Sequence, residues 1–161
     1  MSDLNPVLLI AGPTASGKSA LAMDLAEAFD GVVINADSMQ VYQDLRLLTA
    51  RPSADDEPRV PHRLFGVMAA AELCSVGHWL NMATTEIESA WGGGRLPLVT
   101  GGTGMYVRAL TQGLAHIPEI PDDINAEVRA RYDEIGGEAF REELASVDPD
   151  AARRLPAGDS Q

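Results

Sequence analysis

The sequence predicts an α/β fold in which crossover helices connect the strands of a parallel β-sheet. Two observations support this prediction. Three short apolar runs have the length of buried strands, and they lie at residues 6–10, 32–34 and 96–99. Three segments with helical spacing alternate with them, and these lie at residues 20–29, 76–91 and 105–110. Strand-then-helix units of this kind place their turns at one edge of a parallel sheet, which is where such sheets bind ligands.

Composition limits the class of protein. The chain has 161 residues, 45% of them hydrophobic, which is enough for one domain with a core, or for one domain and part of another. No apolar run approaches the roughly 20 residues of a membrane span, and no secretory signal is visible. Cys74 is the single cysteine, so no disulfide framework exists, and we expect a cytoplasmic protein with no membrane partner.

The charge balance is acidic, with 12 basic and 24 acidic residues and a net charge of −12. An extended surface that binds nucleic acid should instead carry clustered Lys and Arg. The balance therefore counts against an extended surface of that kind, but it leaves room for a local basic channel.

The most informative stretch is GPTASGKS at residues 12–19, which matches the phosphate-binding pattern G-x-x-x-x-G-K-[ST]. It follows the first predicted strand and precedes a predicted helix with Leu21, Leu25, Ala28 and Phe29 at helical spacing. Glycine permits the tight turn, and the helix N-terminus favours bound phosphate. Lys18 adds charge, and Ser19 offers a hydroxyl to Mg²⁺. The expected phosphate-binding residues are Gly12, Pro13, Thr14, Ala15, Ser16, Gly17, Lys18 and Ser19.

Two further turns follow predicted strands. Asp37 lies just beyond residues 32–34, where it either faces the phosphate-binding loop or serves as a cap or turn residue. Residues 100–104 read TGGTG, which is either a bare crossover turn or a ligand-facing turn with Thr103 in the cleft. Ser75 is expected to cap the helix at 76–91, whose predicted face is Leu80, Ala83, Ile87 and Trp91.

Other segments are less specific. Residues 50–58 are polar and contain two prolines, so they predict a surface loop. His62, at the start of a possible short strand, is either a catalytic base or a structural residue. Both tryptophans, Trp79 and Trp91, are expected to pack in the interior and not to stack on bases.

The character of the chain changes after Gly113. A proline-bearing linker at 117–121 precedes Asp122, a candidate helix cap, and a helix at 123–135. Gly136-Gly137 should break that helix before a second one at 138–146. We therefore predict an α/β core at 1–116 and the start of a helical insertion at 117–161, with the chain ending inside a loop.

Together these motifs closely resemble those of the tRNA dimethylallyltransferase (isopentenyltransferase) family. The resemblance rests on GPTASGKS, INADSMQVY, TARPS, VPHRL and LPLVTGGTGMY in this order. It implies a P-loop NTPase-like fold and transfer of a dimethylallyl group from its diphosphate to N6 of adenosine 37 in the tRNA anticodon stem-loop. It further implies that the chain is an N-terminal portion of such an enzyme.

The resemblance also implies residue roles. The phosphate-binding loop would hold the diphosphate, with Mg²⁺ at Ser19, and Asp37 would be the general base. Thr103 would lie at the junction of tRNA and allyl substrate, as a second catalytic residue. The positions implied to contact tRNA are Asp37, Ser38, Met39, Gln40, Thr103, Asn125 and Gln161. The protein is expected to act as a monomer.

Two alternatives remain open from the sequence. A loop of this length also serves P-loop kinases of small molecules or nucleotides, although no arginine-rich lid is visible. The second alternative is that the chain is an inactive, truncated fragment that binds diphosphate. The sequence also departs from the family pattern, with Arg51 in place of Lys and Asn125 where an Arg is usual.

Overall fold

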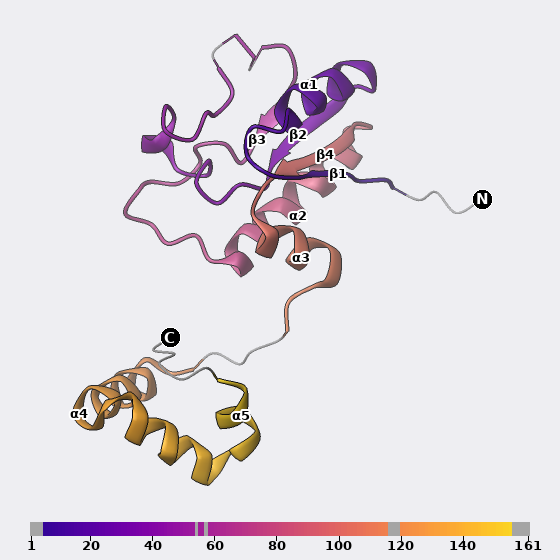
Figure 1. Cartoon of the computed structure of the whole chain (residues 1–161). Helices are drawn as coiled ribbons and strands as arrows, with labels where there is room; N and C mark the ends of the chain where they lie inside the picture. Colours follow the sequence, from indigo (N-terminus) through magenta and orange to yellow (C-terminus); the bar gives the residue numbers. More distant parts are fainter. Residues whose placement is uncertain (1–4, 54, 57, 116–119, 156–161) are drawn as a thin grey trace. The chain divides into compact units, whose positions relative to one another are not determined.

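The computed structural model describes residues 5–53, 55–56, 58–115 and 120–155. The chain forms two compact units, Met1–Leu114 and Ala115–Gln161, and each unit has its own secondary structure (Figure 1). None of the helices in the described ranges is long and apolar enough to cross a membrane.

The first unit is built on a four-stranded parallel sheet with the strand order β1-β4-β2-β3. The strands are β1 (Leu8–Ala11), β2 (Gly31–Asn35), β3 (His62–Arg63) and β4 (Leu96–Gly101). All five residues of β2 are buried, as expected for a parallel strand with helices over both faces. The predicted parallel α/β fold is confirmed, and β1, β2 and β4 lie close to the predicted ranges.

Two helices connect strands of the sheet: α1 (Lys18–Ala28) lies between β1 and β2, and α2 (Val76–Gly92) lies between β3 and β4. A third helix, α3 (Gly104–Gln112), follows β4. The predicted cap of α2 is confirmed, because Ser75 Oγ accepts a hydrogen bond from the His78 amide at 3.1 Å. Both α2 and α3 end at glycines, since their C-caps are Gly93 and Gly113.

The buried face of α1 differs from the predicted one. Ala22, Met23 and Ala26 are buried, whereas Leu21 and Phe29 are 50% and 62% exposed. The helix has apolar residues on every side of its own surface, so their spacing alone could not identify the buried side. The two alanines face inward where the helix lies close to the sheet: a Cβ added at Gly31 would lie 3.0 Å from Ala26 Cα.

The buried face of α2 is close to the prediction but shifted at two positions. Ala83 and Ile87 are buried as expected, together with Trp79 and Ala90, while Leu80 and Trp91 are half-buried. Trp79 is fully buried and stacks on Tyr106 with the ring centroids 4.2 Å apart. Trp79 therefore packs in the core, as predicted.

The second unit contains α4 (Asp122–Val147) and α5 (Pro149–Arg154). The predicted break is confirmed at Gly136, which has a non-helical conformation (φ 77°, ψ 162°) inside α4. The two halves of α4 contact each other: the rings of Tyr132 and Phe140 lie 5.6 Å apart, and Arg131 pairs with Glu143.

The predicted cap at the start of α4 is wrong. Pro121 occupies the cap position, and its extended conformation (φ −53°, ψ 143°) starts the helix one residue earlier. Asp122 lies in the first turn, where a negative charge still interacts favourably with the helix dipole. Most of the predicted linker, at residues 117–119, lies outside the described residues.

Candidate functional site

The phosphate-binding loop, residues 12–19, connects β1 to the first turn of α1. Gly17 adopts a left-handed conformation (φ 84°) that other residues rarely adopt, directly before α1 begins at Lys18. The amides of the first helical turn have no intrahelical partner, so they are available to an anion at the positive end of the helix. Lys18 Nζ donates a hydrogen bond to the Pro13 carbonyl at 2.6 Å, which holds the ammonium across the loop.

A cavity of about 560 Å³ opens beside this loop. Thr14–Ser19 form one wall, and Asp37 and residues 100–102, at the end of β4, contribute to the others. Met23, Val33 and Phe65 add apolar surface to the same cavity. Of the eight predicted phosphate-binding residues, Gly12 and Pro13 start the loop and lie outside this lining. The cavity therefore joins a phosphate-binding loop, an apolar surface and a carboxylate.

The turn that carries Asp37 is held by a buried amide. Asn35 is fully buried, and its Nδ2 donates to the carbonyls of Asp37 (3.0 Å) and Leu64 (3.1 Å). Its Oδ1 accepts from the Asp37 amide at 2.8 Å. Trp79 Nε1 in turn donates to the Asn35 carbonyl at 2.9 Å. Because these groups satisfy one another in the interior, they hold the Asp37 backbone at the cavity edge.

Both of the alternatives considered for Asp37 apply. Its Oδ1 accepts a hydrogen bond from the Met39 amide at 2.9 Å, so it is a turn residue. It is also half-buried and lines the cavity. The structure shows no partner for its Oδ2 among the described residues, which leaves that oxygen available to a ligand.

Thr103, the N-cap residue of α3, braces the same turn. Its Oγ1 accepts from the Ser38 amide at 2.9 Å and lies 3.3 Å from Ser38 Oγ, and its own amide donates to the Ala36 carbonyl. The backbones approach so closely that a Cβ at Gly101 would lie 2.2 Å from the Ala36 carbonyl carbon. Gly101 and Gly102 line the cavity, whereas Thr103 is not among its lining residues. The glycines therefore allow the close backbone packing against Ala36 and also line the cavity.

The remaining residues predicted to contact tRNA lie in different places. Met39 is 51% exposed, and Gln40 lines the cavity while its Nε2 donates to the Thr49 carbonyl at 2.9 Å. Asn125 is exposed in the first turn of α4, in the second unit, with its Nδ2 bonded to the Ile120 carbonyl. Gln161 lies outside the described residues.

Residues 49–62 supply a cavity wall that sequence reasoning missed. Residues 50–58 were predicted to form a surface loop, yet seven residues of the segment 49–62 line the cavity: Thr49, Ala50, Arg51, Pro52, Asp56, Arg59 and His62. The Arg51 Nη1 donates to the carbonyls of Tyr42 and Gln43, so the side chain fixes the start of this wall. The available signals were the arginines within an otherwise acidic loop and the motifs TARPS and VPHRL at its two ends.

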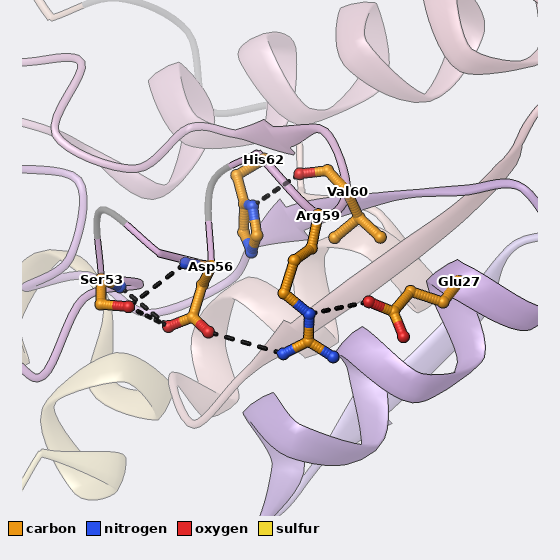
Figure 2. A network of polar contacts seen from close by, with 6 residues as sticks. All are labelled: Glu27, Ser53, Asp56, Arg59, Val60 and His62. Carbon is orange, nitrogen blue, oxygen red and sulfur yellow. Dashed lines mark hydrogen bonds and ion pairs between the residues drawn. The ribbon is translucent and has the colours of Figure 1, made fainter.

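A polar network holds this wall against α1 (Figure 2). Arg59 Nε donates to Glu27 Oε1 at 2.8 Å and its Nη1 lies 3.7 Å from Asp56 Oδ1. Hydrogen bonds from Ser53 lower the pKa of the Asp56 carboxyl, and Glu27 raises the pKa of the Arg59 guanidinium. His62 Nδ1 lies 2.9 Å from the Val60 carbonyl, and its ring packs edge-on against Phe65. These contacts give His62 a structural role beside the cavity.

The lone cysteine, Cys74, packs beside Tyr106, which donates a hydrogen bond from its hydroxyl to Cys74 Sγ at 3.6 Å. Burial raises the pKa of the Tyr106 hydroxyl, and the bond to Cys74 adds to the shift. The sulfur is half-buried, which agrees with a packing role.

The donor set of the cavity fits a magnesium ion that is shared with a phosphate ligand. No cluster of three or more His, Cys, Asp or Glu side chains occurs in the described part of the chain. Mg²⁺ is usually held by one or two protein oxygens, with phosphate oxygens and water completing its octahedron. The exposed hydroxyl of Ser19 and the carboxylates of Asp24 and Asp37 all line the cavity and can supply such oxygens.

Two protein-family models match the chain. The family model described as "IPP transferase" matches residues 40–161, and the model described as "isopentenyl transferase" matches residues 5–65. Among curated proteins, the chain is 52% identical over 160 residues to a tRNA dimethylallyltransferase of Rhodospirillum centenum. It is 56% identical over 154 residues to one of Methylocella silvestris. The alignments cover 99% and 96% of this chain.

The chain spans about half the length of the curated relatives it matches, 51% of each of these two. Among solved structures it resembles the full-length tRNA isopentenylpyrophosphate transferase of Bacillus halodurans, with 33% identity and a TM-score of 0.68. That match covers 97% of this chain and 52% of the other. It also resembles a eukaryotic dimethylallyltransferase acting on tRNA, with 27% identity, a TM-score of 0.81, and coverage of 95% and 38%.

Proposed function

Because the chain belongs to the IPP transferase family, we propose that it carries the allyl-diphosphate and base-binding half of a tRNA dimethylallyltransferase. The reaction transfers a dimethylallyl group from dimethylallyl diphosphate to N6 of adenosine 37 in tRNA and releases diphosphate. The single observation that carries the proposal is one cavity lined by the phosphate-binding loop, three apolar side chains and Asp37. We further propose that the protein acts in the cytoplasm as a monomer.

The phosphate-binding loop would bind the diphosphate. Its first-turn amides and Lys18 offer donors to the bridging and terminal oxygens, and Thr14 and Ser19 add hydroxyls beside them. As the allylic carbon–oxygen bond breaks, negative charge grows on the departing diphosphate. Donors already oriented by the fold stabilise that charge without reorganising. Magnesium, held at Ser19, would neutralise further charge on the diphosphate when it is bound.

Asp37 would be the general base. The adenine amine attacks the allylic carbon, and the proton it loses passes to the carboxylate. The Asp37 Oδ1 is engaged by the Met39 amide, so Oδ2 is the oxygen available for this proton. The buried Asn35 amide fixes the aspartate backbone, which keeps the base at the cavity edge.

The apolar lining would receive the dimethylallyl group. Met23, Val33 and Phe65 supply surface for a branched five-carbon chain beside the phosphate-binding loop. Such surface excludes water, which would otherwise compete with the amine for the allylic carbon.

The segment 37–40 and Thr103 would contact tRNA at the mouth of the cavity. Ser38 is held by Thr103 and Gln40 by Thr49, so the segment presents its side chains on a braced turn. The target base must leave its stack to enter such a cavity. Asn125 and Gln161 are proposed as further tRNA contacts, and the helical second unit as part of an insertion that binds the anticodon stem.

The function is tested by incubating the chain, and a version extended to the length of its relatives, with dimethylallyl diphosphate, Mg²⁺ and an unmodified tRNA that has adenosine at position 37. Mass spectrometry of the digested tRNA should show the dimethylallyl adenosine. A folded, extended protein that leaves the tRNA unmodified would contradict the proposal. Phosphoryl transfer from ATP without use of the allyl diphosphate would favour the kinase alternative.

A binding measurement with a matched control tests the role of the phosphate-binding loop independently of the transfer reaction. Inorganic pyrophosphate should bind to the chain in the presence of Mg²⁺, and Lys18→Ala should weaken this binding by about tenfold or more, because a charge-assisted hydrogen bond is lost. Arg95→Gln, on an exposed arginine that pairs with Asp30, is the control and should bind as the wild type does.

A further inference from the structure

The acidic charge of the chain poses a problem for any polyanionic partner. With 24 acidic and 12 basic residues, the net charge is −12. Long-range attraction therefore cannot bring a nucleic acid to the surface. Phosphate contacts must come from individual cations that are free to leave solvent for a phosphate oxygen. The partners of each cation in the structure show which ones qualify.

All 12 basic residues lie within the described ranges, and most already have a partner. Carboxylates pair with five arginines, at positions 59, 63, 95, 131 and 153. Backbone carbonyls accept hydrogen bonds from Lys18 and from four more arginines, at positions 46, 51, 141 and 154. Arg108 and Arg129 are the two for which the described residues provide no carboxylate, carbonyl or hydroxyl partner.

Arg108 is exposed on α3, the helix that begins directly after Thr103. It lies one helical turn beyond Gly104 and three residues after Met105, which is 56% exposed. Residues three and four apart share a helix face. Arg108 therefore projects from the same exposed side as the start of α3, whose cap residue braces the turn carrying Asp37 and Ser38.

Arg129 is exposed on α4 in the second unit. It follows Asn125 by four residues, so both lie on one face of this helix. The neighbouring Arg131 is bound by Glu134 and Glu143, which raise the pKa of its guanidinium. Recruiting Arg131 to a phosphate would first require breaking two ion pairs, whereas Arg129 has none to break.

We propose that Arg108 and Arg129 are phosphate-binding residues for the tRNA backbone, one in each unit. The guanidinium is planar and always charged, and its paired donors match two phosphate oxygens. This inference rests on the proposed function, because it names residues that hold the proposed tRNA substrate. It extends that function to two positions outside the cavity.

The test compares tRNA affinity of four single variants across a range of salt concentration. Arg108→Gln and Arg129→Gln remove the proposed contacts. Arg95→Gln and Arg153→Gln are the controls, one in each unit, and each removes the same charge from an exposed, ion-paired arginine. Thermal unfolding of each variant checks the fold, and binding of inorganic pyrophosphate checks the cavity.

The proposal predicts that each of the first two variants binds tRNA roughly threefold to tenfold more weakly at about 0.1 M salt. The slope of log affinity against log salt should fall by roughly 0.7–0.9 per variant, since one phosphate contact is lost. Pyrophosphate binding should not change. The controls should keep the wild-type slope.

Equal slopes for Arg108→Gln, Arg129→Gln and the controls would overturn the proposal and make both arginines ordinary solvated charges. A response in one variant alone would overturn the assignment of the other residue. If wild-type protein modifies tRNA but these variants behave as controls, the inference fails and the proposed function stands. If the wild type, extended as above, neither binds nor modifies tRNA, both fail.

Discussion

At the scale of single residues, the site depends on a polar side chain inside an apolar strand. Asn35 ends β2, where the preceding residues are apolar, and it is fully buried. A buried amide is costly unless its donors and acceptor are all used. Here they bind the backbone on both sides of Asp37 and the carbonyl of Leu64. The strand therefore sets the position of the proposed base.

Replacing that base tests its role. Asp37→Asn preserves the size of the side chain, and the carbonyl oxygen can still accept from the Met39 amide. It removes the group that takes the proton, so we expect turnover to fall by roughly 10²–10⁴-fold. Pyrophosphate affinity, measured by calorimetry, should stay close to that of the wild type. Parallel losses in turnover and in pyrophosphate affinity would instead make Asp37 part of the diphosphate site.

At the scale of elements, spacing predicted where helices lie more reliably than which side they bury. In α2 the polar residues mark the outer side, and Ala83 and Ile87 are buried as predicted. In α1 apolar residues occur on every side, and the side that is buried carries Ala22, Met23 and Ala26. The wall at 49–62 could not be predicted, because it depends on Arg59 reaching Glu27, which is 32 residues away in the chain.

The close backbone contact at the end of β4 leads to a prediction about stability. A Cβ at Gly101 would lie 2.2 Å from the backbone of Ala36, whereas one at Gly102 would lie 3.4 Å from the Gly12 carbonyl. Gly101→Ala must push apart two backbones, so it should lower the free energy of unfolding by about 1–3 kcal/mol. Gly102→Ala is the adjacent control and should cost much less. Chemical denaturation of both variants measures the difference, and equal stabilities would contradict the close approach.

The ion pair between the two halves of α4 leads us to expect that the stability of the second unit depends on pH. Arg131 lowers the pKa of the Glu143 carboxyl below its ordinary value of 4.5. A carboxyl with a lowered pKa in the folded state stabilises the fold fully above its ordinary pKa, and this contribution disappears as the pH falls through the lowered value. The second unit should therefore lose stability below about pH 4.5.

Glu143→Gln removes this titration. The variant should be less stable than the wild type at pH 7, and the difference should shrink as the pH falls below about 4.5. Helix content followed by circular dichroism during thermal unfolding, at several pH values, measures the effect. A difference that is independent of pH would show that the Arg131–Glu143 pair does not couple the two halves of α4.

At the scale of the whole molecule, the sequence predicted the architecture and the cavity's main parts. Glycine and lysine at fixed spacing predicted the phosphate-binding loop, and the strand ends left Asp37 either facing that loop or serving as a cap or turn residue. The loop and Asp37 line one cavity. The sequence could not predict that Thr103 braces Ser38, since a hydroxyl in a turn bonds to whatever backbone the fold brings near. The helical second unit forms a separate body, and its proposed role in binding tRNA depends on Asn125 and Arg129.

The central claim is that the diphosphate leaves from the phosphate-binding loop while the amine that attacks the allylic carbon gives its proton to Asp37. A crystal structure of the chain with Mg²⁺ and a non-hydrolysable dimethylallyl thiolodiphosphate tests it most directly. We predict that the diphosphate binds the amides at residues 14–19 and Lys18, with the dimethylallyl group against Met23, Val33 and Phe65 and its reacting carbon open to Asp37. A diphosphate bound elsewhere, or an allyl group directed away from Asp37, would contradict the mechanism.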